Sequence, residues 1–426
     1  QIEKFSNAGK NFMFRHVILT LLFLFLWSST TYAILFERRK TFESEISWFV
    51  YPVVGSIPGV QDFYGLGGTV SGIGGSESDI TLVSLKGDAE YFDDDFQIDI
   101  LSIFDIPLFT SHLTFSWFST KIRNAGWPEG ERGIVSDPES MYYLLATNVD
   151  ASGGELSFNV LENQLELYYG YSDASVKPYG LVDPNGTFYN AQNSGIIESP
   201  RGYRYGLYID DTDNRRDPRI GYRFQYEKWG QPSSRAGNSE YFQEDYNISG
   251  YLPILDEGKG VLVLNQFFGS STVIKKGKVD RSQFVCDNSL KPGCQDLLDE
   301  LYARQKAEAE NGKATSLGGT NRLRGYRTNR FYDSYTNFQG AEFRWYVHEA
   351  QEAFNFFLEK GTFAGLQLAF FYERGTVSPD KYSLWKNMRS SYGAGTRFIF
   401  NTIIVRIDRG IGKEGGETTF FVGYPF

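Results

Sequence analysis

Residue types that carry chemistry in many enzymes are scarce in this chain of 426 residues. It has two cysteines and three histidines, and the histidines, at positions 16, 112 and 348, lie far from both cysteines, so no zinc site is predicted. No Gly-x-Ser-x-Gly motif is present, and HEAQE at 348–352 lacks the second histidine of a zinc-protease helix. We therefore expect no catalytic residue, no metal, no cofactor and no enzymatic activity.

An excess of positive charge is also absent. The formal net charge is −10, and without the first 33 residues, which carry Lys4, Lys10, Arg15 and Glu3, it becomes −12. Binding to phosphate backbones requires a basic face. We therefore expect no nucleic acid among the partners of this protein.

Long apolar runs are limited to one, VILTLLFLFLW at 17–27, which belongs to a predicted secretory signal. Arg15 and His16 precede this run, and Thr-Tyr-Ala at 31–33 offers small residues where a signal peptidase cleaves. The run is too short and wrongly flanked for a spanning helix, and a buried N-terminal helix is the alternative interpretation. We interpret residues 1–33 as upstream residues plus a signal peptide, and residues 34–426 as a single domain.

Aromatic residues, in contrast, are abundant at 17% of the chain, and they recur in alternating segments. In GAEFRWYV at 340–347, Phe343, Trp345 and Val347 lie on one side of a predicted strand, and Glu342 and Arg344 lie on the other. Segments of this kind fit an outer-membrane β-barrel, whose apolar side faces lipid and whose polar side faces the lumen. A secreted array of β-sandwiches is the alternative fold.

Seventeen segments have the alternation and composition of strands. They are 46–55, 62–72, 79–88, 95–105, 110–121, 139–148, 154–161, 164–173, 202–210, 219–229, 241–254, 259–270, 338–348, 362–377, 389–401, 402–411 and 416–426. Because bacterial barrels made of one chain close with an even number of strands, we predict sixteen and expect one incorrect assignment among the first twelve. The predicted fold class is all-β, a transmembrane antiparallel β-barrel.

One long segment, 271–337, separates two of these strands. It contains Cys286 and Cys294, which we expect to form a disulfide in an oxidising compartment. In the loop-entropy model, closing so short a loop stabilises the folded chain by about 2.5 kcal/mol. The leucines after Cys294 have helical spacing. Since connections of this length are usually functional or disordered, we predict a functional loop that contains a short helix.

Two stretches resemble the outer membrane protein 85 superfamily, which includes the bacterial surface antigen domain and the BamA-like and TamA-like barrels. LGGTNRLRGY at 317–326 is similar to the Arg-Gly-aromatic signature of the sixth extracellular loop in that superfamily. DTDNRRDPRIGYRF at 211–224 is similar to a D-x-R-x-x-P-x-x-G strand start, with Asp213, Arg215, Pro218 and Gly221 in place. The resemblance covers about residues 205–230 and 317–426, and the N-terminal half agrees only in its strand pattern.

The resemblance implies that the extracellular loop folds inward and that its arginine pairs with acids on the following strands. The residues placed in this loop lock are Arg324, Gly325, Tyr326, Glu342, Glu373 and Asp408. Members with insertion or secretion roles carry POTRA domains before the barrel. About a dozen residues separate Ala33 from the first predicted strand, so we expect a barrel that lacks POTRA domains.

The last ten residues resemble the signal by which the barrel-assembly machinery recognises its clients. Alternation places Phe420, Tyr424 and Phe426 on a single face, as a lipid-facing aromatic stripe. An edge strand of a soluble protein that ended in this way would risk aggregation. We therefore expect the barrel-assembly machinery to be a partner during biogenesis.

The resemblance implies a location in the outer membrane of a Gram-negative bacterium, in contact with its lipid. The function that it implies is assembly or translocation of protein or lipid, together with separate periplasmic or surface protein partners. A structural or diffusion pore gated by the inward loop is the alternative function.

Overall fold

The computed structural model describes residues 46–426 apart from 58–59, 77, 89–94, 110–111, 135–142, 162–163, 184–186, 191–200, 232–238, 256–257, 285–292, 357–358 and 401–403. The strands are β1 (Ser47–Ile57), β2 (Val60–Ser71), β3 (Asp79–Gly87), β4 (Phe96–Pro107), β5 (Leu113–Glu129), β6 (Glu131–Arg132), β7 (Tyr143–Val160), β8 (Leu165–Val182), β9 (Phe188–Asn190), β10 (Arg201–Thr212), β11 (Gly221–Gln231), β12 (Glu240–Pro253), β13 (Gly260–Lys275), β14 (Phe331–Tyr332), β15 (Tyr335–Phe356), β16 (Glu359–Ser378), β17 (Arg389–Phe400), β18 (Ile404–Gly412) and β19 (Gly415–Val422). The helices described are α2 (Cys294–Asn311) and the short 3-10 helices η1 (Ile73–Gly75), η3 (Arg281–Gln283) and η4 (Lys381–Ser383).

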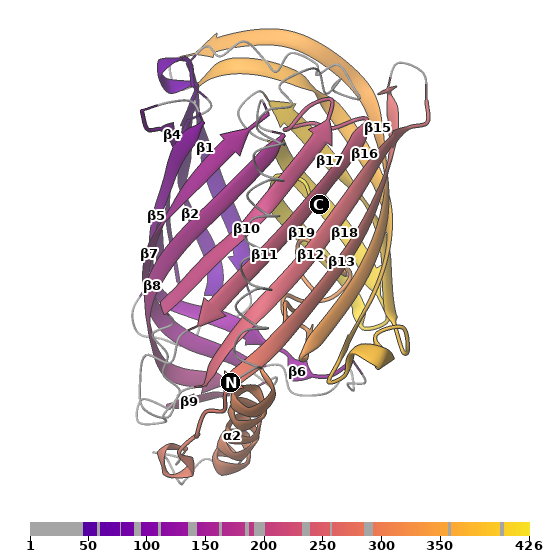
Figure 1. Cartoon of the computed structure of the whole chain (residues 1–426). Helices are drawn as coiled ribbons and strands as arrows, with labels where there is room; N and C mark the ends of the chain where they lie inside the picture. Colours follow the sequence, from indigo (N-terminus) through magenta and orange to yellow (C-terminus); the bar gives the residue numbers. More distant parts are fainter. Residues whose placement is uncertain are drawn as a thin grey trace, which may run out of the picture.

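The long strands pair antiparallel with their neighbours in sequence and form a closed barrel (Figure 1). The ring is closed between β1 and β16, where Trp48 lies opposite Lys360 and Phe49 lies opposite Glu359. Among the described residues, this ring contains thirteen strands, namely β1, β2, β3, β4, β5, β7, β8, β10, β11, β12, β13, β15 and β16. Strands β17, β18 and β19 continue the sheet from β16, and the short β9 lies beside β8.

The closure therefore differs from the predicted ring of sixteen strands. The reason is the length of the β15–β16 hairpin, whose strands have 22 and 20 residues. Pairing of β17 with β16 begins at Phe363, so Glu359 and Lys360 remain available to β1. Figure 1 shows this orange hairpin curving across one end of the barrel.

A second difference concerns β7, which unites the predicted segments 139–148 and 154–161. The intervening residues Ser152 and Gly153 keep partners on both β5 and β8. The small residues of DASGG at 150–154 continue the ladder on both sides. These two segments were the incorrect assignment among the first twelve.

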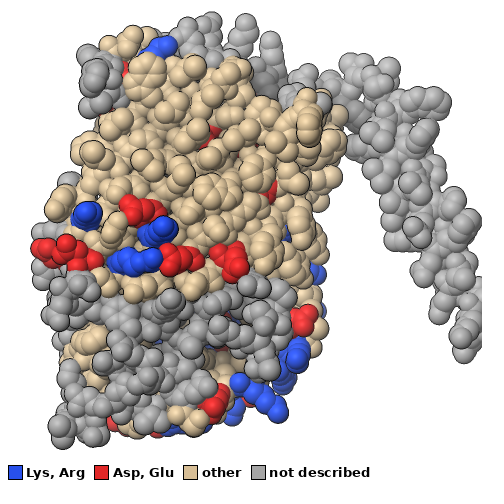
Figure 2. Space-filling view, turned by 90° about the vertical axis from the view of Figure 1, so that its left-hand side faces the viewer, with Lys and Arg blue, Asp and Glu red and all other residues tan. Residues whose placement is uncertain are grey.

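Many large apolar side chains are exposed on the outer face of the barrel. Directly opposed residues of neighbouring strands share a face, so the exposed Leu156 of β7 and Tyr169 of β8 lie side by side on it. Figure 2 shows, on one side of the barrel, a broad surface with few charged side chains above a belt of acidic and basic side chains. Charged residues on the outer face include Arg123, which forms an ion pair of 2.6 Å with Asp150.

The long connection between β13 and β15 contains helix α2, as predicted. Leu297, Leu298 and Leu301 are buried and pack with Leu181 and Tyr189. None of the helices in the described ranges has the length and apolar character needed to cross a membrane. The predicted signal peptide within residues 1–33 lies outside the described residues.

Only one of the two cysteines of the predicted disulfide lies within the described residues. Cys294 is the first residue of α2 and is buried in the same apolar cluster as its leucines. Cys286 lies outside the described residues. The pairing of these two cysteines stays a prediction.

Candidate functional site

Three carboxylates gather on the buried face of β15, β16 and β18, and the loop before β15 supplies the arginine that joins them. The side chains of Arg324, Glu342, Glu373 and Asp408 are all 0% exposed. Arg324 Nε donates to Glu373 Oε1 at 2.7 Å, and its Nη1 lies 2.8 Å from both Glu342 Oε2 and Asp408 Oδ2. The structure therefore brings together the arginine and the three acids named from the sequence, here called the loop-lock cluster.

Arg324 is held by its backbone as well as by its side chain. Its amide N–H donates to Glu373 Oε2 at 2.8 Å, and the guanidinium carbon lies 3.5 Å from the ring centroid of Phe371. Burial opposes the charge, but Glu373 and the other two carboxylates raise the pKa of Arg324 above its ordinary value. The arginine therefore stays charged, and its bonds to the carboxylates are charge-assisted.

Gly325 and Tyr326 bring the loop against β18. A Cβ on Gly325 would lie 2.5 Å from the carbonyl carbon of Ile411, so only glycine allows the two backbones to approach this closely. The Tyr326 hydroxyl donates to the Ser390 carbonyl at 3.1 Å and accepts from the Lys413 amide at 3.1 Å. All six residues predicted for the loop lock therefore lie in one connected set of contacts.

Three arginines of this site were not predicted, namely Arg344, Arg397 and Arg406, and each is 0% exposed. Arg344 Nε donates to Glu342 Oε1 at 2.8 Å, and Arg397 Nη1 donates to Asp408 Oδ1 at 2.6 Å. Arg406 Nη1 lies 3.4 Å from Asp408 Oδ2. The spacings Glu342-x-Arg344 and Arg406-x-Asp408 signalled two of them, because alternate residues share a strand face. Arg397 could be found only from the register that places it opposite Arg406.

A second loop arginine, Arg322, extends the contact towards β12 and β13. Its guanidinium carbon lies 3.7 Å from the ring centroid of Phe267. Burial lowers the pKa of Arg322 to about 10, against the opposing attraction of Asp245 and Glu373. Beside it, Thr315 Oγ1 donates to Asp245 Oδ2 at 2.6 Å. The loop thus contacts the buried face of the barrel from β12 to β18.

The predicted aromatic stripe at 418–426 is divided between two sides of the sheet. Phe420 is 58% exposed on the outer face, as expected, but β19 ends at Val422. Gly423 then adopts a φ of 96°, a conformation that favours glycine, and turns the chain. Tyr424 and Phe426 consequently pack against the buried residues of the barrel instead of continuing the outer stripe. The prediction of one lipid-facing stripe was wrong for these two residues.

The turn between β10 and β11 contacts the inward segment after β19. Asp217 Oδ1 accepts from the Tyr424 hydroxyl at 2.7 Å and also from the Tyr346 hydroxyl. Burial and the Asp217 charge raise the pKa of Tyr424, so its hydroxyl stays protonated and donates. This turn is the predicted D-x-R-x-x-P-x-x-G segment. Its Asp213 Oδ1 accepts from the Arg219 amide at 2.8 Å, and Gly221 begins β11.

The contact between β1 and the β15–β17 sheet, here called the seam, is short. Among the described residues it has two paired residues on each strand. The Phe49 ring lies 6.3 Å from that of Phe354 and 5.2 Å from that of Phe400. Across the described part of the chain, β19 pairs only with β18, so its second edge has no hydrogen-bonded strand beside it. In the same described part, no group of His, Cys, Asp and Glu is placed to hold a metal ion.

No protein-family model matches the sequence, and no curated protein matches it either. Solved structures do match the fold. CdiB from Escherichia coli gives a TM-score of 0.50 at 11% sequence identity, and the match covers 89% of this chain and 62% of that chain. The chain therefore has the β-barrel fold of this CdiB protein.

Two further structures were matched at lower TM-scores. BamA from Haemophilus ducreyi lacking POTRA domains 1–3 gives a TM-score of 0.48 at 14% identity, covering 89% of this chain and 69% of that chain. CdiB from Acinetobacter baumannii gives 0.47 at 10% identity, covering 89% of this chain and 59% of that chain. The chain spans about three fifths of each CdiB chain. The likeness to CdiB from Escherichia coli confirms the all-β barrel fold that was predicted from the sequence.

Proposed function

We propose that this protein lies in the outer membrane of a Gram-negative bacterium and assembles or translocates protein or lipid there, together with separate protein partners. The observation that carries the proposal is the seam, where Trp48 and Phe49 are the only described residues of β1 that pair with β16. An edge strand with unpaired backbone groups can accept another strand by β-augmentation. The second edge of β19, which has no paired strand in the described part of the chain, offers such groups to an incoming chain.

The loop-lock cluster supports a function in which one part of the barrel stays fixed while the seam opens. Its charge-assisted contacts hold the loop on β15, β16 and β18, the strands that lead to the seam. Truncating one member of a buried, hydrogen-bonded ion pair costs about 3–5 kcal/mol, because the remaining charge stays buried without its partner. The lock therefore keeps this part of the sheet rigid and the interior plugged while the short β1–β16 contact opens.

A diffusion pore gated by the same loop is the second candidate function. It is favoured by a cavity of about 390 Å³ that lies against β4, β5, β7, β8, β10 and β11, away from the loop-lock cluster. In this function the seam stays closed, and the position of the loop sets the conductance. The two functions thus differ in whether the seam must open.

A covalent bridge across the seam separates these functions. Trp48→Cys and Lys360→Cys place two cysteines directly opposite each other on antiparallel strands, within the Cα separation that a disulfide requires. They are introduced in a background with Cys286→Ser and Cys294→Ser. The oxidised and reduced proteins are reconstituted in liposomes, and a urea-denatured eight-stranded outer-membrane barrel is added as a client. Its folding is followed by heat-modifiable migration on a gel.

We expect the reduced protein to accelerate folding of the client relative to empty liposomes, and oxidation to abolish the acceleration. Tyr64→Cys with Lys86→Cys, a directly opposed pair within the β2–β3 ladder, is the matched control and leaves the acceleration unchanged. Equal folding with the seam bridged would contradict a role for the seam. A steady conductance that is insensitive to the bridge, without any acceleration, would favour the pore.

A further inference from the structure

The interior face of β5, β7, β8, β10 and β11 carries the cavity that favours the pore, and neither proposed function assigns a role to the side chains that line it. Six of its lining residues form what we call the lumenal pocket, namely Phe118, Glu155, Ser172, Arg204, Glu227 and Trp229. Register places them on the face opposite the exposed Leu156 and Tyr169, because Glu155 lies opposite Gly170, Gly170 opposite Arg204, and Arg204 opposite Trp229. The cavity of about 390 Å³ lies within the ~300–1,000 Å³ range of small-molecule sites.

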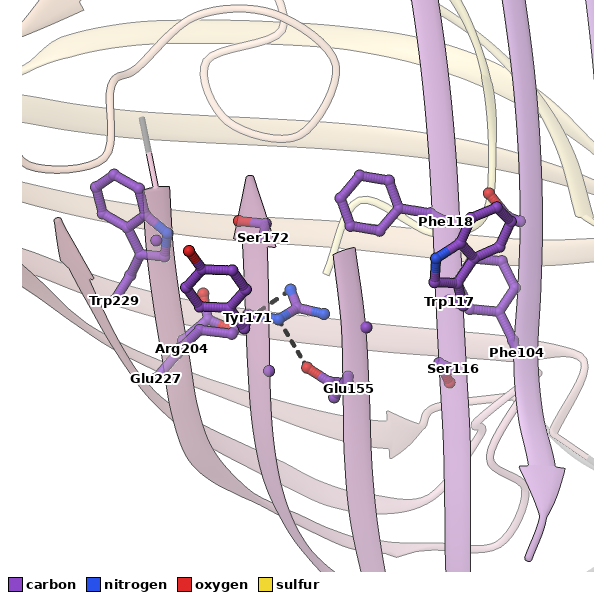
Figure 3. Close-up of a pocket in the computed structure, with 14 residues that line it drawn as sticks. Phe104, Ser116, Trp117, Phe118, Glu155, Tyr171, Ser172, Arg204, Glu227 and Trp229 are labelled. Carbon is purple, nitrogen blue, oxygen red and sulfur yellow. Dashed lines mark hydrogen bonds and ion pairs between the residues drawn. The ribbon is translucent and has the colours of Figure 1, made fainter. Parts of the chain in front are cut away.

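The charged groups of the lumenal pocket stand in a row across three strands. Arg204 Nε donates to Glu155 Oε2 at 2.7 Å, and Arg204 Nη1 lies 4.0 Å from Glu227 Oε2 (Figure 3). The Arg204 side chain is 48% exposed, in contrast to the fully buried arginines of the loop-lock cluster. Donors and acceptors of this row are therefore available to a ligand in the cavity.

Aromatic rings lie on both sides of this row. Figure 3 shows Trp229 on one side of Arg204 and Phe118 on the other. A Cβ on Gly202 would lie 2.7 Å from the Trp229 Nε1, so the absence of a side chain there lets the indole lie close to the sheet. The pocket thus combines apolar ring faces with a strip of hydrogen-bonding groups, the pattern of a site that fixes the orientation of a small molecule.

The order of the charged side chains in the row, with Arg204 between Glu155 and Glu227, determines which class of ligand fits. Two carboxylates disfavour an anion, and the guanidinium between them disfavours a cation. A neutral molecule whose groups both donate and accept can bond with Arg204 and with Glu155 or Glu227 at the same time. Its apolar C–H face can cover Trp229 or Phe118. A puckered ring that carries hydroxyl groups has both properties, since the hydroxyl groups donate and accept and the ring has an apolar C–H face.

We propose that the lumenal pocket binds a neutral saccharide, with Arg204, Glu155 and Glu227 bonding to its hydroxyl groups and Trp229 covering one face of its ring. The test uses the full chain folded in a polyoxyethylene detergent, since a sugar-headed detergent would compete for the site. The protein is applied to an array of immobilised neutral glycans, with spermidine and citrate titrated separately as a cation and an anion. Binding of the retained glycan is then measured by isothermal titration.

We expect at least one neutral glycan to be retained, and Arg204→Gln to weaken its binding at least tenfold, because the variant loses the charge-assisted hydrogen bonds that the guanidinium donates. Arg123→Gln is the matched control, because Arg123 makes a similar 2.6 Å pair with Asp150 on the outer face. This variant should bind like the parent. Ser172→Phe, which fills the cavity and removes no charge, should abolish binding.

Three results would overturn the proposal. The first is that the array retains no neutral glycan, and the second is that spermidine or citrate binds in place of glycans. The third is that Arg204→Gln and Ser172→Phe bind the glycan as tightly as the parent does. Heat-modifiable migration of each variant establishes that a loss of binding does not come from a loss of the folded barrel. Since client folding at the seam is measured separately, failure of this proposal leaves the proposed function untouched.

Discussion

The two halves of the barrel interior use the same pair of residue types in different ways. On β15, β16 and β18, Arg324 contacts three carboxylates and all four side chains are 0% exposed. On β7 and β10, Arg204 has one close carboxylate, Glu155, and is 48% exposed. An arginine surrounded by acids fixes a loop in place, whereas an arginine with spare donors beside a cavity remains available for binding.

The difference in burial also separates the two pairs in energy. Removing one partner from a buried pair leaves a charge without compensation and costs about 3–5 kcal/mol. An exposed pair contributes about 0–1 kcal/mol, because water replaces the lost partner. The half that contains the loop-lock cluster, here called the loop half, is therefore expected to control the stability of the barrel. In the half that contains the lumenal pocket, here called the pocket half, substitutions should have little effect on stability.

Substitution of the aromatic residues at the end of the chain should have the largest effect, because we expect it to block assembly of the barrel. Phe420 faces outward and Tyr424 packs inward, so replacing both with serine removes an outer contact and the bond to Asp217 that completes the loop half. We expect Phe420→Ser with Tyr424→Ser to block assembly while export across the inner membrane continues, and Phe426→Ser to have the same effect. The measurement is heat-modifiable migration of the outer-membrane fraction. Normal levels of folded barrel would mean that these aromatic residues are not the recognition element.

Truncation of the two arginines compares the halves directly. Arg324→Ala removes the shared partner of three buried carboxylates and should lower the free energy of unfolding by about 3–5 kcal/mol. Arg204→Ala should lower it by less than about 1 kcal/mol. Urea unfolding in detergent measures both. Equal losses for the two variants would remove the distinction between the halves.

The predicted disulfide tests whether the loop is held mainly beside α2, at the end that contains Cys286 and Cys294. Non-reducing peptide mapping should show Cys286 joined to Cys294, and Cys286→Ser should lower the free energy of unfolding by about 2.5 kcal/mol in the loop-entropy model. A loss greater than that of Arg324→Ala would place the main restraint on the loop beside α2, away from the loop-lock cluster.

Loss of the hydrogen bond between Tyr424 and Asp217 should have the smallest effect on the free energy of unfolding. Tyr424→Phe keeps the ring and removes one hydroxyl that donates to Asp217 at 2.7 Å. Since Asp217 keeps the Tyr346 hydroxyl as a donor, we expect a loss of about 1 kcal/mol. Tyr169→Phe, on the exposed outer face, is the matched control and should change nothing measurable in the same urea experiment.

Sequence alone was sufficient for the parts of the molecule that depend on alternation and on local motifs. The two-residue period located the strands, and LGGTNRLRGY identified Arg324 together with the acids that it contacts. Gly325 also followed from the motif, and the structure supplies the reason, since its backbone meets that of Ile411.

Features that depend on strand register could not be read from the sequence. Arg397 joins the site because it lies opposite Arg406, and Trp229 joins the pocket because it lies opposite Arg204. Closure at β16 depends on how far one hairpin extends beyond β17, which no local pattern records. The inward turn at Gly423 was missed because alternation was continued across a glycine with a positive φ.

Conductance of the barrel tests most directly whether contacts of Arg324 hold the loop across its interior. The full chain and its Arg324→Ala variant are compared in planar bilayers, both with the seam bridged by oxidised Trp48→Cys and Lys360→Cys so that only the interior can open. We predict a low conductance for the parent chain and a larger, fluctuating conductance for the variant, because the unpinned loop leaves the buried face of β15, β16 and β18. Identical low conductance for a variant that remains folded would contradict this account.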